Sequence, residues 1–218
     1  MRITVTYFLD VISSWCFWSE PAWAEWKRRY EGKVHFEWKI ALMDSSGLPT
    51  SRLQEEWYYR RSGVLMRSPS MLSSAWYEPI LPEYLAPNLI AEAGKDFGIT
   101  DDRVRLALAY AGLHDGKRFG EWEVAAEIGA RAAGVEKAKL LERARSAEVE
   151  ERARAATAEF KSLQVTQRPT FVVDTEIGDR AVFSGIVRVA PLASVIDSML
   201  DDAEAYASFA AHFGSPPA

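Results

Sequence analysis

The spacing of hydrophobic positions divides the chain into three parts, and the first part has the pattern of a β-α-β unit. Residues 2–9 are a run of β-branched and aromatic side chains, which predicts a strand. Residues 15–30 place four tryptophans at helical spacing among charged side chains, which predicts a helix, with a kink or a restart at Pro21. Residues 34–42 carry apolar side chains on one side and predict a second strand.

The middle part is predicted to be helical. Prolines interrupt residues 44–87, where a short helix is predicted over residues 52–61. From residue 87 onward, alanine-rich segments with Glu and Arg show helical spacing, and one long helical segment is predicted over residues 136–160.

The last part returns to strands. Residues 170–174 and 180–184 predict two strands, and Gly178-Asp179 between them predicts a hairpin turn. Residues 190–206 predict a closing helix, and the tail at residues 214–218 is predicted to be disordered.

This order of elements predicts an α/β fold, β-α-β followed later by β-β-α, with a large all-helical insertion. We assign residues 1–44 and 162–210 to the domain that contains the sheet, and residues 45–161 to the helical insertion domain. A length of 218 residues suits one domain with a sizeable insertion.

Charge and hydropathy exclude two classes of partner. The net charge of -5 and the pI near 5.4 argue against nucleic-acid binding, which requires a basic surface. No apolar run approaches the roughly 20 residues of a membrane helix, and the start lacks the pattern of a secretory signal. We therefore expect no nucleic-acid partner and no membrane association.

The cysteine and histidine content bounds the chemistry. A single cysteine excludes an intramolecular disulfide, so we expect the reducing cytoplasm as the location. His35, His114 and His212 are scattered, and no metal-ligand spacing is present. We expect no metal site and no tightly bound cofactor.

The candidate chemistry lies where the first strand passes into the first helix. Ser13-Ser14-Trp15-Cys16 occupies this junction. At the start of a helix, backbone N–H groups and the helix dipole stabilise negative charge, which lowers the pKa of a thiol placed there. The thiolate that benefits is either the protein's own or that of a ligand.

Two motifs carry a family resemblance that covers the chain to about residue 200. The segment Asp10-Val11-Ile12-Ser13-Ser14-Trp15-Cys16-Phe17 resembles the active-site motif of the DsbA-like branch of the thioredoxin superfamily. Within that branch it is similar to the FrnE-type oxidoreductases, the 2-hydroxychromene-2-carboxylate isomerases and the kappa-class glutathione transferases. Arg168-Pro169-Thr170-Phe171-Val172-Val173 is similar to the cis-proline loop and following strand of this group.

The resemblance implies a thioredoxin fold, in which the helical block is the family's insertion and the Arg168–Pro169 peptide bond is cis. It places the catalytic residues at Ser13 and Cys16. It also implies a set of substrate-binding residues in the two loops: Ser14, Trp15, Arg168, Pro169 and Thr170.

The chain departs from the family at two places. Ser13 stands where a redox enzyme carries its attacking cysteine, and one thiol cannot run a dithiol–disulfide cycle. In the isomerase and transferase relatives, the matching serine donates a hydrogen bond to the thiolate of glutathione. Those relatives follow the last strand with Gly, a small polar residue and Asp, whereas this chain has Gly185-Ile186-Val187, which counts against glutathione.

Other interpretations of the same residues stay open. Cys16-Phe17-Trp18-Ser19 also fits a Cys-x-x-Ser monothiol motif with Cys16 as an exposed nucleophile. Alternatively, Cys16 is a buried apolar residue and Ser13 a helix N-cap with no chemistry. Five aromatic residues after the second strand line a pocket or pack in the core: Trp57, Tyr58, Tyr59, Trp76 and Tyr77.

Three functions follow from this sequence. The first is a DsbA/FrnE-like oxidoreductase-family enzyme with a degenerate Ser-x-x-Cys site that acts on a thiol or a thiol-conjugated small molecule. The second is a glutathione-dependent isomerase or transferase, and the third is a non-catalytic thioredoxin-fold binding module. We expect a small-molecule thiol such as glutathione as the partner, and a homodimer.

Overall fold

The computed structural model describes residues 2–78, 81 and 83–214; most of the predicted disordered tail, residues 215–218, lies outside the described residues. Within these residues, four strands, β1 to β4, and eight α-helices, α1 to α8, follow the predicted order. Their bounds are β1 Ile3–Leu9, α1 Ser14–Arg29, β2 Val34–Ile40, α2 Arg52–Met66, α3 Leu85–Gly94, α4 Arg103–Ala109, α5 Trp122–Ala133, α6 Lys137–Ala144, α7 Ala147–Ser162, β3 Thr170–Thr175, β4 Arg180–Ser184 and α8 Val189–Phe213, with a 3-10 turn at Lys95–Phe97 and a π-helical turn, η2, at Tyr110–His114.

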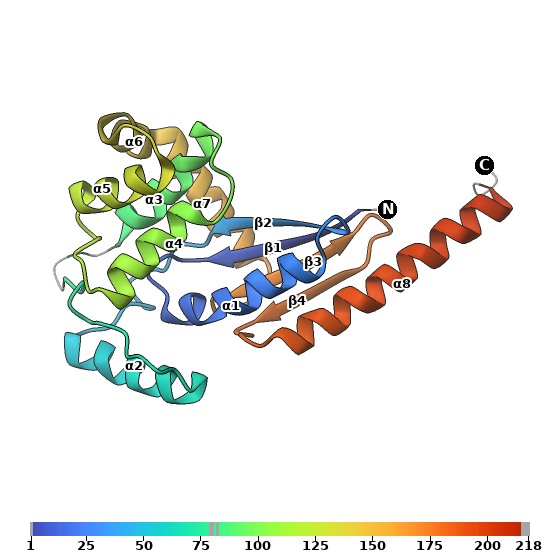
Figure 1. Ribbon diagram of the computed structural model, residues 1–218, viewed down its shortest axis with the longest axis horizontal. Helices are drawn as coiled ribbons and strands as arrows, with labels where there is room; N and C mark the ends of the chain where they lie inside the picture. The colour runs from blue at the N-terminus through green and yellow to red at the C-terminus, as the bar shows by residue number, and fades with distance from the viewer. Residues whose placement is uncertain (1, 79–80, 82, 215–218) are drawn as a thin grey trace.

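The strands form one sheet in the order β2-β1-β3-β4. β1 pairs with β2 in parallel, while β1 with β3 and β3 with β4 pair in antiparallel fashion. This is the arrangement of the predicted thioredoxin fold, since a crossover helix joins the parallel pair. Figure 1 shows α1 and α8 along the sheet and the insertion helices α3 to α6 gathered beyond one end of it, while α7 reaches back and contacts β2.

Aromatic side chains fill the space between α1 and the sheet. The ring of Tyr7 lies 4.7 Å from that of Phe171 on the neighbouring strand and 5.0 Å from that of Trp23 on α1. Trp26 packs edge-on against Phe171, with 4.9 Å between ring centroids. These four side chains are at most 1% exposed, so burial of this aromatic face fixes the position of α1 on the sheet.

α1 is one continuous helix through Pro21, so of the two predicted alternatives, a kink or a restart, the restart is wrong. A proline removes one helix hydrogen bond, here the one that would reach the carbonyl of Phe17. The packing of Trp23 and Trp26 against the sheet continues the helix beyond that point. The restart is therefore absent.

The long helical segment predicted over residues 136–160 is two helices, α6 and α7. The helix is interrupted at Arg145 and Ser146. The hydroxyl of Ser146 accepts a hydrogen bond from the amide of Val149, 3.4 Å away. A serine at this position caps the second helix, which hydrophobic spacing alone does not reveal.

α8 is longer than the predicted helix over residues 190–206 and extends to Phe213. Its first half packs on the rest of the molecule through Leu192, Ile196 and Met199. Figure 1 shows its second half projecting past the sheet, and there Tyr206 and Phe209 are 58% and 60% exposed. The homodimer stays a prediction, which a molar mass measured in solution would test.

Candidate functional site

The loop between β1 and α1 is held by the buried carboxylate of Asp10. One carboxylate oxygen accepts hydrogen bonds from the amide of Ile12, at 3.1 Å, and from the side chain of Asn88, at 2.7 Å. The other oxygen accepts from the amide of Met43, at 2.7 Å. Burial raises the pKa of Asp10, although these three donors oppose the rise. The carboxylate thereby connects the loop to the chain segment that follows β2 and to α3.

Asn88 completes this connection from the insertion. Its side-chain oxygen accepts a hydrogen bond from the amide of Val11, 2.9 Å away, while its nitrogen also donates to the carbonyl of Tyr84, at 3.1 Å. Asn88 is 1% exposed. A helix of the insertion therefore determines the position of the loop that leads into Ser13.

Ser13 is the N-cap of α1. Its hydroxyl oxygen accepts a hydrogen bond from the amide of Cys16, at 3.3 Å, which leaves the hydroxyl proton free to be donated elsewhere. In the described part of the chain, no protein group accepts a hydrogen bond from the amides of Ser14 or Trp15. Three hydrogen-bond donors therefore stand at the positive end of the helix dipole.

Cys16 lies in the first turn of α1 and is buried, with 3% of its surface exposed. Burial raises the pKa of its thiol to about 11, and hydrogen bonding to Ser13 opposes this rise only in part. The thiol is therefore neutral at physiological pH, and a neutral thiol is a poor nucleophile. This geometry matches the interpretation of Cys16 as a buried apolar residue, rather than that of an exposed monothiol.

The proline loop lies opposite the start of α1. The Arg168–Pro169 peptide bond is cis, and the carbonyl of Pro169 accepts a hydrogen bond from the amide of Gly185, at 2.7 Å. Thr170 is fully buried, and its hydroxyl donates to the carbonyl of Gln167, at 2.6 Å. The side chain of Thr170 therefore holds the loop together.

The side chain of Arg168 is already bound within the protein. Its guanidinium donates hydrogen bonds to the carbonyl of Ala41 and to that of Leu42, the latter at 2.7 Å, and lies 4.4 Å from the ring centre of Phe160. Burial lowers the pKa of this arginine, and the charge of Asp10 opposes the change. Arg168 thus joins the proline loop to the end of β2.

Both loops line one cavity of about 380 Å³, which we call the Ser13 cavity. A volume of this size is within the usual range for small-molecule sites. α2 contacts α1 and contributes to the lining of the cavity, and Figure 1 shows it apart from the other insertion helices. The lining residues come from four segments: Ile12–Trp15, Met43 with Ser46–Leu48, three residues of α2 (Glu55, Tyr58 and Arg61), and Thr166–Arg168.

The predicted aromatic cluster is divided between cavity, core and surface. Tyr58 lines the Ser13 cavity, whereas Trp57 is 56% exposed. Tyr59, Trp76 and Tyr77 are buried, and the indole nitrogen of Trp76 donates to the hydroxyl of Tyr59, at 2.8 Å. Most of the cluster therefore packs beneath α2 rather than against a ligand.

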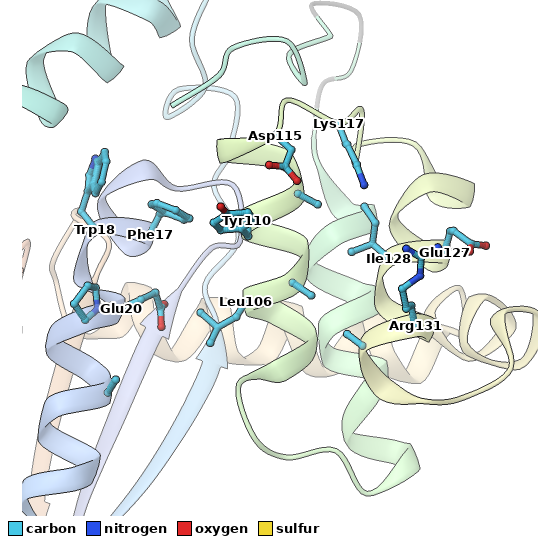
Figure 2. Close-up of a pocket in the computed structure, with 15 residues that line it drawn as sticks. Phe17, Trp18, Glu20, Leu106, Tyr110, Asp115, Lys117, Glu127, Ile128 and Arg131 are labelled. Carbon is cyan, nitrogen blue, oxygen red and sulfur yellow. Dashed lines mark ion pairs between the residues drawn. The ribbon is translucent and has the colours of Figure 1, made fainter. Parts of the chain in front are cut away.

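A larger, apolar groove of about 860 Å³ runs from the flank of α1 across α4 to α5, and we call it the α1–α5 groove. Figure 2 shows Phe17 pointing toward Tyr110 across this groove, with Ile128 of α5 on the other side of α4. Its charged side chains mostly have partners: Glu20 lies 2.5 Å from Arg105. Asp115 contacts His114, and Glu127 contacts Arg131.

Three residues of the site were not identified from sequence. Asn88 has no local signal, because its partners are 77 and 78 positions away along the chain. Asp10 belongs to the motif, but its role as the centre of the loop was not predicted. Glu55 shares the inner face of α2 with Tyr59 and Ser62, a helical spacing that was available in the sequence.

Neither a metal cluster nor a membrane helix is found in the described ranges. No group of three or more His, Cys, Asp or Glu side chains in these ranges is arranged to hold a metal ion. Among the described helices, none combines the length and the apolar character needed to cross a membrane.

Comparison with known proteins gives matches to solved structures. No protein-family model matches the chain, and no curated protein sequence matches it. A Nitrosomonas europaea protein named as a candidate protein disulfide isomerase is 16% identical, with a TM-score of 0.74 over 93% of this chain and 99% of that chain. The cytosolic disulfide reductase DsbM from Pseudomonas aeruginosa is 16% identical, with a TM-score of 0.71 over 91% of this chain and 98% of DsbM.

DsbA from Pseudomonas aeruginosa is also similar, at 17% identity and a TM-score of 0.59, over 95% of this chain and 86% of DsbA. These similarities bear on the fold, because the identities are low. The chain has the DsbA-like thioredoxin fold with a helical insertion, as the two motifs predicted.

Proposed function

We propose that this protein binds a low-molecular-weight thiol, or a conjugate of one, in the Ser13 cavity and activates the bound sulfur for reaction. The observation that carries this proposal is the start of α1. There the Ser13 hydroxyl and the amides of Ser14 and Trp15 line a cavity of ligand size, while the only thiol of the chain is buried and neutral.

The start of α1 is suited to stabilise a thiolate that a ligand supplies. The hydroxyl of Ser13 donates to the sulfur, since its oxygen is already occupied by the amide of Cys16. The amides of Ser14 and Trp15 and the helix dipole add to this stabilisation, so the pKa of the bound thiol falls. The bound thiolate then serves as the nucleophile that the chain itself lacks.

The absence of a second cysteine directs the chemistry away from a dithiol cycle. A disulfide cycle within one chain requires two thiols, and this chain has one. Support for an external thiol comes from the same fold: DsbM from Pseudomonas aeruginosa has been solved with GSH, and that structure matches this chain with a TM-score of 0.69. Glutathione is therefore the first thiol to test, and the reducing cytoplasm is the compartment in which we propose that the protein works.

The test is to measure the pKa of the thiol of protein-bound glutathione, using the ultraviolet absorbance of the thiolate to monitor its ionisation. We expect it to be at least about one unit below that of free glutathione, and Ser13→Ala to remove most of this difference. Ser146→Ala is the matched control, because it also deletes a serine N-cap, that of α7, away from the cavity. Each loss of a cap costs about 1 kcal/mol, so both variants should fold.

Two outcomes would oppose the proposal. Equal binding and an equal pKa shift in Ser13→Ala and the wild type would remove Ser13 from the mechanism. Binding with no change in the pKa of the thiol would instead favour the non-catalytic binding module.

A further inference from the structure

The inner face of α2 presents one acidic side chain to the Ser13 cavity. Glu55 is 7% exposed and lines the cavity. The other two polar groups of this face are bonded within the protein: Tyr59 accepts from Trp76, at 2.8 Å, and Ser62 accepts from the indole of Trp18, at 3.0 Å. Glu55 is therefore the group of this face that is directed to the cavity.

No cation of the described chain neutralises Glu55. Burial raises the pKa of its carboxyl, and the hydroxyl of Tyr59 is the sole neighbour that opposes the rise. The two arginines of the cavity are engaged elsewhere: Arg168 with main-chain carbonyls, and Arg61 over the rings of Trp57 and Tyr58, at 5.1 Å and 5.4 Å. Buried carboxylates in proteins are normally paired, so this arrangement lacks a positive charge.

We infer that Glu55 binds an ammonium group of the ligand, so that the substrate class is thiols that also carry a primary amine. This inference rests on the proposed function in that it takes the bound ligand to be a thiol, whereas the ammonium site at Glu55 can be tested without one. The ligand then spans the cavity, with its sulfur at Ser13 and its ammonium group at α2.

A positively charged ligand accounts for two features of Glu55, its burial at the cavity and its lack of a neutralising cation. An ammonium group supplies the cation that the protein does not place there, and a charge-assisted hydrogen bond is stronger than a neutral one. The segment after β4 offers no competing acidic side chain, because Ile186 and Val187 are apolar. α2 offers an acidic group on a different element of the fold.

The experiment compares three thiols, glutathione, 2-aminoethanethiol and 2-mercaptoethanol, by calorimetric titration of four proteins. The first two thiols carry an ammonium group, whereas the third has a neutral hydroxyl in its place. The proteins are the wild type, Ser13→Ala, Glu55→Gln and Glu56→Gln. Glu56→Gln is the matched control, because Glu56 is the next residue of α2 but its carboxylate contacts Ser74, at 3.1 Å, outside the Ser13 cavity.

We expect Glu55→Gln to weaken the binding of both ammonium-bearing thiols about tenfold or more, and that of 2-mercaptoethanol less than about twofold. Glu56→Gln should bind all three as the wild type does. Ser13→Ala should weaken all three thiols alike. The inference is overturned if Glu55→Gln binds the ammonium-bearing thiols normally, or if it weakens 2-mercaptoethanol to the same extent.

A thiol-free peptide separates this inference from the proposed function. γ-Glutamyl-alanyl-glycine keeps the amine of glutathione and lacks its sulfur. If no thiol binds the wild type, the proposed function fails, yet binding of this peptide that Glu55→Gln weakens about tenfold would still support the ammonium site. If neither the thiols nor the peptide bind, the ammonium site is wrong as well.

Discussion

The Ser13 cavity and the α1–α5 groove both border α1, and they differ in what α1 offers to each. The groove has more than twice the volume, about 860 Å³ against about 380 Å³, and is bordered by Phe17, Trp18 and Pro21 from the flank of the helix. The cavity receives the N-terminal end of the helix, with the hydroxyl of Ser13 and two amides that have no hydrogen-bond acceptor in the described chain.

This difference shows that volume and chemical capacity are separate properties. In the groove, charged side chains such as Glu20 and Glu127 are largely neutralised by arginines, so a ligand there meets mainly apolar surface. In the cavity, the amides of Ser14 and Trp15 have no acceptor, and the carboxyl of Glu55 has no cation, in the described chain. We therefore expect changes in the cavity to alter chemistry, and changes in the groove to alter apolar binding alone.

The largest effect is expected from returning a thiol to the cavity. Ser13→Cys restores a Cys-x-x-Cys spacing with Cys16, and the new thiol lies at a helix N-terminus, where its pKa is lowered. We expect this variant to form an intramolecular disulfide and to show disulfide reductase activity above that of the wild type. A thiol count before and after oxidation, together with a reductase assay, measures both.

Ala24→Cys is the control for that experiment, because Ala24 lies on the same helix but borders the groove. It is eight residues from Cys16, roughly 12 Å along the helix axis, which is too far for a disulfide. Equal behaviour of the two variants would mean that the helix start has no special role.

An intermediate effect is expected in the pH dependence of stability. It reports whether the sulfur of Cys16 is shielded from the water in the Ser13 cavity. The thiol ionises near 9.0 in the unfolded chain and at about 11 in the folded protein. Above pH 9 the unfolded chain therefore loses a proton that the folded protein keeps. The free energy of unfolding should therefore fall between pH 9 and 11, by up to about 2.7 kcal/mol from this group. Below pH 9 the thiol is protonated in both states, and the stabilisation by this group is fully present.

Denaturant unfolding of the wild type and of Cys16→Ala at several pH values isolates this contribution. Other groups, such as Tyr7, titrate in both proteins, so the difference in slope between them is the quantity of interest. Identical slopes would show that water from the cavity hydrates the ionised sulfur.

The smallest effect on thiol binding is expected from the groove. Leu106 is 36% exposed and borders it. Leu106→Gln should reduce the binding of an apolar fluorescent dye severalfold, while the affinity for glutathione should change less than about twofold. A tenfold loss of glutathione affinity would show that the two spaces act together.

The local elements of the fold were accessible from the sequence. The β-α-β start, the β-β-α end and the two loops at Ser13 and Pro169 follow from hydrophobic spacing and motifs, and the structure contains them. The errors arose at two places where packing or a helix cap decides the structure, which hydrophobic spacing does not show. Packing carried α1 through Pro21, and the hydroxyl of Ser146 started a new helix.

The candidate site was predictable where it is contiguous in the sequence. Ser13, Ser14 and Trp15 adjoin one another, and the helix start that they form is a local structure. Asn88 and Glu55 come to the site from the insertion, so their positions depend on long-range packing. The contact of Arg168 with a substrate stays a prediction, and the carbonyls that its side chain binds lie over 100 residues earlier in the chain.

The presence of a hydroxyl rather than a thiol at Ser13 also determines how the start of α1 responds to oxidants. Peroxide converts exposed thiolates stepwise to sulfenic, sulfinic and sulfonic acids, a sequence that a hydroxyl does not enter. Cys16, buried and neutral, is protected from the same reaction. The loop that begins α1 should therefore keep its chemistry under oxidative stress, and under the proposed function the sensitivity to oxidants would belong to the bound thiol.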